Sequence, residues 1–208
     1  MIRQRQHPAS TLSTTRTEAF TDGVFAIAAT LLILDLTTTT FDSVSTDAEL
    51  WAALLSEWML FVNFALSFVL LCLMWMVHVS QFEHISRVDN MLIWLNNGRL
   101  LMIVLVPFST RITTEYSEFY AGRVILAVNF FLAIVFSWLQ WTWAVRHREQ
   151  ILPDLTQEEA VAYGRGNLSA LILSGTVLVL SPFIGSIAFT VFLLDGFLTR
   201  RLHGQGDD

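Results

Sequence analysis

The chain has 208 residues, of which 54% are hydrophobic and only 14% are charged. About a quarter of the residues of an average soluble domain are charged, so this composition indicates a membrane protein. The net charge is -6, and the twelve basic residues, all arginines, are too dispersed to suggest a nucleic-acid interface. The single cysteine, Cys72, excludes an intramolecular disulfide.

The first apolar stretch has features that set it apart from a lipid-facing span. Residues 1–15 are polar and are predicted to form a flexible cytoplasmic arm, and residues 16–36 are long enough to cross a bilayer. Small residues within the stretch suit close helix contacts, and the charges at its entry are costly in hydrocarbon. Thr21 and Asp22 are expected to cap the helix start. Four residues recur at i, i+3, i+4 and i+7 and therefore share one face: Ile27, Thr30, Leu31 and Leu34. We therefore predict that this helix lines the centre of an assembly.

Five more apolar segments follow, which gives an all-α fold with six spans, a transmembrane domain over residues 16–201 and a short cytoplasmic tail at 202–208. The second span is longer than a bilayer requires, so either it is tilted or its first turns lie in the interface. Pro107 is predicted to end the third span, and Ser181-Pro182 to end the fifth. Thr156 and Glu159 have capping-box spacing, which predicts a helix start there. The five segments are residues 50–79, 91–108, 121–145, 161–180 and 183–198.

Arginine positions predict the orientation in the membrane. An even number of spans, six, places both termini on the same side of the membrane. On the other side, where the loops at 37–49 and 111–118 lie, only Arg111 and Arg123 are near span ends. Because arginine is enriched in cytoplasmic segments, both termini are predicted to be cytoplasmic in a multi-pass protein of the cell membrane. The arginines on the side of the termini are Arg3, Arg5, Arg16, Arg87, Arg146, Arg148, Arg165, Arg200 and Arg201.

The polar residues within the spans do not form a recognisable catalytic set. A lone histidine such as His78 more often hydrogen-bonds a neighbouring helix than binds metal, and its six-residue separation from His84 does not favour a metal pair. Arg99 has two open alternatives: its side chain extends to the cytoplasmic interface, or it pairs with Asp22 or Asp89. There is no Ser-His-Asp set, phosphate loop or metalloprotease motif, so neither an enzyme nor a cofactor is predicted.

Three blocks in the first half of the chain resemble a known family. Arg16-x-x-x-Phe20-Thr21-Asp22 is similar to the Arg…Phe-Ser-Asp signature on the first helix of the transmembrane protein 175 family, the endolysosomal and bacterial potassium channels. The order and spacing of the three blocks agree with those of the family across the first half of the chain, whereas the second half resembles the family in hydropathy alone. The other two blocks are Trp75-x-x-His78 with Phe82, Ile85, Arg87 and Asp89, and Trp94-Leu95-Asn96 with Pro107-Phe108-x-Thr110.

The resemblance implies a potassium-preferring channel in which four identical subunits in a lipid membrane surround one pore. Ile27, Leu31 and Leu34 would form stacked apolar rings, and Thr30 would add a ring of hydroxyl groups. This chain departs from the family in having Thr21 in place of a serine, Val79 where a second histidine is common, and a charge at Arg99. The residues that would hold the pore helix in place are Arg16, Phe20, Thr21, Asp22, Trp75, His78, Trp94 and Asn96.

An apolar constriction has physical consequences that differ from those of a carbonyl-lined filter. An apolar ring does not replace the water that an ion loses, so potassium, with its weaker hydration, passes more easily than sodium, and a ring that dewets closes the pore. Asp35 and the negative end of the helix dipole would attract cations to the outer mouth. Potassium is the expected permeant ion. Two alternatives remain, a secondary transporter and a non-conducting membrane scaffold.

Overall fold

The computed structural model describes residues 13–37 and 44–194, and in this part of the chain every regular element is a helix. The elements are α1 (Thr14–Thr37), α2 (Asp47–Ser56), α3 (Trp58–Phe82), α4 (Asn90–Val104), α5 (Val106–Glu115), α6 (Tyr120–Arg146), α7 (Arg148–Ile151), α8 (Gln157–Ile184) and the 3-10 helix η1 (Gly185–Leu194).

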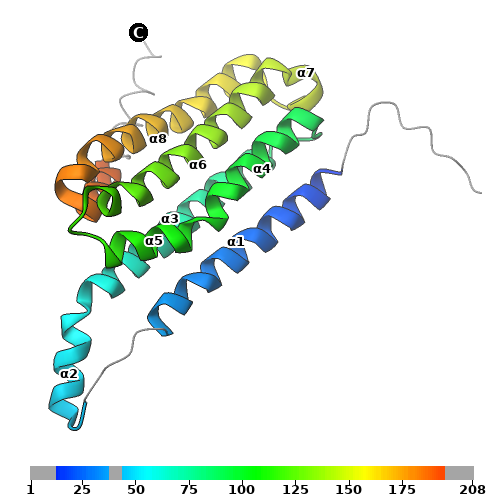
Figure 1. The fold of residues 1–208 in the computed structure, drawn as a ribbon. Coiled ribbons are helices and arrows are strands. Elements are labelled where there is room, and N and C mark those ends of the chain that lie inside the picture. Colours follow the sequence, from blue (N-terminus) through cyan, green and yellow to red (C-terminus); the bar gives the residue numbers. More distant parts are fainter. Residues whose placement is uncertain (1–12, 38–43, 195–208) are drawn as a thin grey trace, which may run out of the picture.

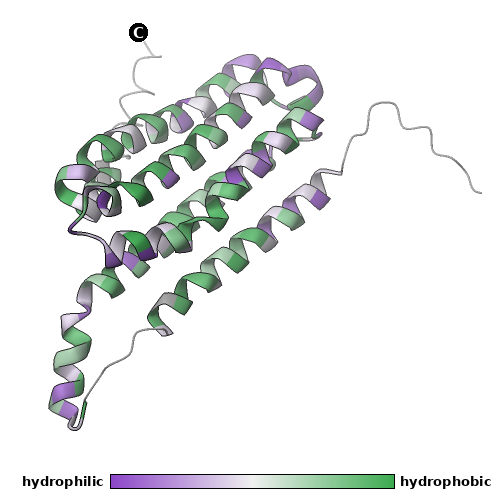
Figure 2. Ribbon diagram, in the orientation of Figure 1, coloured by the Kyte–Doolittle hydropathy of each residue, from purple (hydrophilic) through white to green (hydrophobic). Residues whose placement is uncertain are grey.

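The long helices lie side by side as a bundle, with α2 projecting from one end (Figure 1). Five segments of the described residues are long and apolar enough to cross a membrane; α4 and α5 together count as one of them, and α8 with most of η1 as another. Hydrophilic residues gather at the helix ends and apolar residues cover much of their length, as Figure 2 shows. The described part of the chain is therefore all-helical, and the protein is a membrane protein.

The second predicted span is divided into two helices. Glu57 separates α2 from α3, and only α3 has the length and hydropathy of a membrane span. Helix α2 has no buried residue within the subunit. Of the two alternatives for the long segment, the structure agrees with the one that places its first turns outside the span proper.

The prediction that Pro107 ends the third span is wrong. Pro107 lies in the first turn of α5, where its missing N–H would have no partner in the helix in any case. The helix continues to Glu115, so part of the predicted outer loop at residues 111–118 is helical. Helices α4 and α5 meet at Leu105, which itself keeps helical backbone angles.

The predicted break at Ser181-Pro182 is also wrong, because α8 continues to Ile184. Pro182 cannot donate to the carbonyl of Leu178, but the hydroxyl of Ser181 donates to that carbonyl over 3.1 Å and satisfies it. The break falls at Gly185, whose φ of +58° favours glycine. The first two residues of the predicted sixth span, 183 and 184, belong to α8, and the span continues as the 3-10 helix η1 in place of an α-helix. Residues 195–208, including the end of this span and the tail, lie outside the described residues.

The core is built around α6, which packs against α4, α5 and α8, whereas α1 packs against α3, α4 and α5. Phe130 of α6 lies at its centre and makes an edge contact with Phe189 of η1, with ring centroids 5.6 Å apart. A second apolar cluster around Trp141 closes the end of the bundle that holds α7. Helix α1 thus lies at one edge of the subunit (Figure 1).

Candidate pore-lining helix and its polar support network

Helix α1 presents one buried face to the rest of the subunit. Thr21, Phe25, Ala28 and Leu32 are all buried, and their spacing of four, three and four residues places them on one side of the helix. The helix begins at Thr14, not at the predicted cap, so Thr21 and Asp22 lie about two turns inside it. The prediction that these two residues cap the helix start is therefore wrong.

The opposite face of α1 is apolar and exposed in the single subunit. Ile27 is 61% exposed, Leu34 52% and Leu31 38%. Thr30 lies on the same face, and its hydroxyl donates to the carbonyl of Ile27 over 2.8 Å. Nothing within 4 Å would meet a Cβ added at Gly23, so the subunit itself leaves this side of the helix open. The face that the sequence singled out is thus the one that points away from the subunit core.

A buried polar contact joins α1 to α4. The amide Nδ2 of Asn96 donates a hydrogen bond of 2.9 Å to Oγ1 of Thr21, and both residues are fully buried. The rings of Phe25 and of His78 on α3 are stacked, with centroids 6.2 Å apart and planes inclined by 27°. The structure thereby brings together Thr21, His78 and Asn96, three residues predicted to support this helix.

Arg99 connects these residues, a role that sequence reasoning missed. Its guanidinium donates to Oδ1 of Asn96 over 3.0 Å, to Oε1 of Gln81 over 3.3 Å and to Nδ1 of His78. Arg99 therefore neither extends to the interface nor pairs with Asp22 or Asp89. The signal in the sequence was the i, i+3 spacing of Asn96 and Arg99 on a helix, which places their side chains on the same face.

The two aspartates have neutral partners instead. Oδ1 of Asp22 accepts a hydrogen bond of 2.9 Å from Nε1 of Trp75, which joins α1 to α3 at their exposed edge. Asp89 caps α4 by accepting from the backbone N–H of Leu92, and its other oxygen accepts from Nε1 of Trp143. The structure thus gives Asp22 and Trp75, both predicted support residues, a direct contact.

Three other predicted support residues lie outside this network. Phe20 is exposed, Trp94 is 73% exposed, and the exposed guanidinium of Arg16 makes no hydrogen bond or ion pair with the described residues. The side chain of Asp35, predicted at the outer mouth, lies outside the described part of the structure. No group of three or more metal-binding side chains occurs among residues 13–37 and 44–194.

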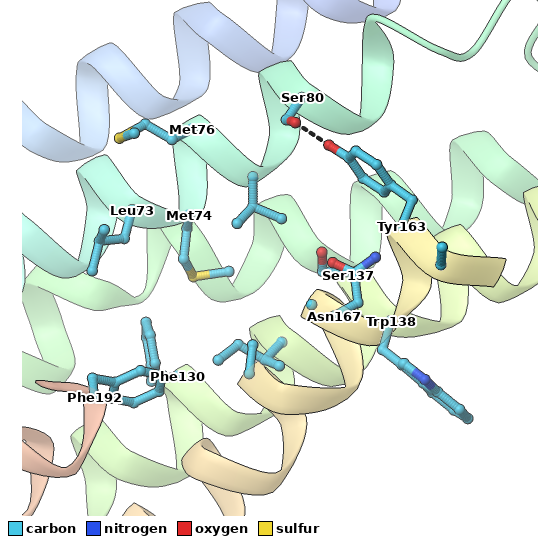
Figure 3. Close-up of a pocket in the computed structure, with 15 residues that line it drawn as sticks. Leu73, Met74, Met76, Ser80, Phe130, Ser137, Trp138, Tyr163, Asn167 and Phe192 are labelled. Carbon is cyan, nitrogen blue, oxygen red and sulfur yellow. Dashed lines mark hydrogen bonds between the residues drawn. The ribbon is translucent and has the colours of Figure 1, made fainter. Parts of the chain in front are cut away.

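A groove of about 530 Å³ lies between α3, α6 and α8, away from α1 (Figure 3). Its lining is mostly apolar and includes Met74, Phe130 and Phe192, with the hydroxyl groups of Ser80 and Tyr163 hydrogen-bonded to each other at its upper end in the view. The groove holds no catalytic combination of side chains.

Comparisons with known proteins find relatives that are ion channels by name. A family model described as the endosomal/lysosomal potassium channel TMEM175 matches residues 16–107. A potassium channel of Streptomyces collinus is 37% identical over 131 residues, covering 61% of this chain and 62% of the relative. The endosomal/lysosomal proton channel TMEM175 of Gallus gallus is 31% identical over 205 residues, covering 92% of this chain and 39% of the relative.

A solved structure extends the similarity to the fold of nearly the whole chain. The crystal structure of a lysosomal potassium-selective channel TMEM175 homolog from Chamaesiphon minutus matches with a TM-score of 0.72 and 28% identity. The match covers 91% of this chain and 97% of that one. The second half of the chain, which the sequence matched in hydropathy alone, is thus included in the structural similarity.

Proposed function

We propose that the chain is a member of the TMEM175 family, to which its matches point, and that it is a potassium-preferring cation channel of the cell membrane and not an enzyme. Four copies, each with six spans and cytoplasmic termini, would surround a central pore lined by α1. The observation that carries this proposal is the division of α1 into a buried face and an exposed apolar face with Ile27, Leu31 and Leu34.

The exposed face of α1 has the chemistry of an apolar constriction. Residues 27, 31 and 34 occupy two turns of helix, about 10 Å along its axis, so in an assembly around α1 they would form successive rings. Such rings offer no substitute for the water around an ion. They favour potassium over sodium because the free energy needed to remove water from potassium is smaller. A narrow ring also dewets, and the same residues would then act as the gate.

Two further residues would assist conduction. Thr30 would place a hydroxyl group between the rings of Ile27 and Leu31, although its proton is engaged by the carbonyl of Ile27 and leaves the oxygen as an acceptor. Asp35, in the last turn of α1, would add negative charge where the helix dipole is already negative. Both features favour cations over anions.

The name of one relative points to the proton as a second ion to be tested. The Streptomyces relative is named a potassium channel and the Gallus relative a proton channel. An apolar ring without a titratable group offers no proton relay, so the exposed face of α1 favours potassium. A secondary transporter would need broken helices near the middle of the membrane. Helix α8 continues through Pro182 and ends at Gly185, so Ser181-Pro182 is not such a break.

Recordings from the purified protein in planar bilayers test the proposal. Unitary currents should reverse near the potassium equilibrium potential, and Leu31→Asn should wet the constriction, raise conductance and reduce the preference for potassium. Ile33→Asn is the matched control, because Ile33 is 44% exposed on the same helix but outside the stripe. Coupled flux without unitary events would indicate a transporter, a reversal potential set by pH a proton channel, and silence under all gradients a scaffold.

A further inference from the structure

Arg99 is a charged residue in the interior of the subunit without a counter-charge. Its side chain has no exposed surface, and no carboxylate among the described residues forms an ion pair with it. A cation buried in a membrane protein is costly, and one that persists there marks a functional position by default. Its neutral partners have to compensate for this charge through their dipoles.

The hydrogen bonds of Arg99 have a fixed direction. A guanidinium group can only donate, so each of its partners must present an acceptor to it. Asn96 therefore turns Oδ1 towards Arg99, and its amide Nδ2 is left to point at Thr21. Gln81 responds in the same way: Oε1 faces Arg99, and Nε2 donates to Oγ of Ser137 and to Oδ1 of Asn167, two residues of the groove wall (Figure 3).

Through Thr21, the rotation of α1 depends on the orientation of the Asn96 amide. It is the only buried polar residue among the described side chains of α1, and the rest of the buried face is apolar. Apolar contacts between helices tolerate small rotations and shifts better than a directional hydrogen bond does. The bond from Asn96 therefore fixes the rotation of α1 at a point about 9 Å along the helix from Ile27 and about 15 Å from Leu31.

We infer that Arg99 is a positioning residue of the pore: it orients the amide of Asn96, which in turn holds α1 at the rotation that directs Ile27, Leu31 and Leu34 towards the axis. This inference rests on the proposed channel function. Arg99 itself touches no permeating ion, since it is fully buried behind α1. Without the charge, the amide loses its preferred orientation and α1 loses its only buried polar contact.

Four variants test the inference through ion selectivity. Arg99→Met and Thr21→Val should shift the potassium-against-sodium reversal potential in the same direction, and the double variant should shift it no further, because both act on one path. Thr21→Ser keeps the hydroxyl group and should retain the original value. Gln140→Leu is the control, since Gln140 is an equally buried polar residue on α6 with no bond to α1.

Two results would overturn the inference. Arg99→Met with unchanged reversal potential and conductance, even at a lower unfolding temperature, would reduce Arg99 to a purely structural role. Additive shifts of Arg99→Met and Thr21→Val would mean that Arg99 acts by another route. If Arg99→Met does not assemble, the neutral but polar Arg99→Gln takes its place with the same expectation, and Arg99→Lys should recover part of the original selectivity because it keeps a charged donor.

A readout that needs no current separates this inference from the proposed function. A spin label on Leu34→Cys, in a Cys72→Ser background, reports the position of α1 among the copies of the assembly. Arg99→Met and Thr21→Val should broaden the distribution of distances between labels, and Gln140→Leu should leave it narrow. If the unmodified protein is electrically silent, the proposed function fails, whereas an unchanged distance distribution in Arg99→Met would refute the positioning role by itself.

Discussion

Nε1 of Trp75 donates a hydrogen bond of 2.9 Å to Oδ1 of Asp22, and this contact joins α3 to α1 one residue away from the buried bond between Asn96 and Thr21. Consecutive residues of a helix point about 100° apart, so α1 is held from two directions at one level. Further along, its contacts with the subunit are the apolar side chains of Phe25, Ala28 and Leu32. The helix is therefore fixed by polar contacts in its first half and by packing in its second half.

Removing the indole donor should loosen the exposed link between α1 and α3. Trp75→Phe keeps an aromatic ring but cannot donate to Asp22, and we expect a loss of at most about 1 kcal/mol of stability because the contact is open to solvent. Thermal unfolding in detergent measures the change. Trp94→Phe is the control, since Trp94 is exposed and makes no hydrogen bond within the described residues; an equal loss in both variants would rule out a specific role for the Trp75 bond.

The two faces of α1 should respond to truncation in opposite ways. Phe25→Ala removes a ring that is 4% exposed and should lower stability by about 3 to 5 kcal/mol, because a cavity remains in the core. Ile27→Ala removes a side chain from the open face and should leave the fold of the subunit intact while it widens the proposed constriction. Unfolding in detergent and bilayer conductance distinguish the two, and strong destabilisation of the subunit by Ile27→Ala would contradict this division of faces.

Gly185 should not tolerate a side chain. Its φ of +58° and ψ of -139° are accessible to glycine and strained for other residues, so Gly185→Ala should destabilise the end of α8 by about 1 to 3 kcal/mol. The strain lies in the backbone, since an added Cβ would lie an ordinary 3.7 Å from Arg123. Gly175→Ala within the same helix has an ordinary 3.8 Å contact with Phe131 and should be neutral or stabilising by comparison. Equal unfolding temperatures for the two variants would contradict the turn assigned to Gly185.

Thr156 should determine where α8 begins. Its hydroxyl accepts from the backbone N–H of Glu159 over 3.2 Å, and the Glu159 carboxylate accepts from the N–H of Thr156 over 2.8 Å. Thr156→Ala should cost about 1 kcal/mol of local stability and speed amide hydrogen exchange in the first turn. Thr156→Ser should keep the slow exchange, and an unaffected exchange rate in the alanine variant would show that the cap does not limit fraying.

The sequence determined the helical class, the start of α8 and the identity of the exposed stripe on α1. These follow from local physics. Long apolar segments indicate membrane-spanning helices, and a capping box satisfies the free N–H groups at a helix start. The 3.6-residue repeat of a helix places the residues of the stripe on one face: Ile27, Thr30, Leu31 and Leu34. The sequence also identified Thr21, His78 and Asn96 as neighbours, because the resemblance in the first half of the chain is specific.

Only the tertiary structure decided where helices continue and how Arg99 is accommodated. Pro107 and Pro182 are both strong local signals for a helix end, yet the first proline falls where no N–H is needed and a serine hydroxyl satisfies the carbonyl freed by the second. The choice between the interface, an aspartate and neutral partners for Arg99 depends on which side chains α3 and α4 bring within hydrogen-bond distance of its guanidinium group. That distance information is absent from any local pattern.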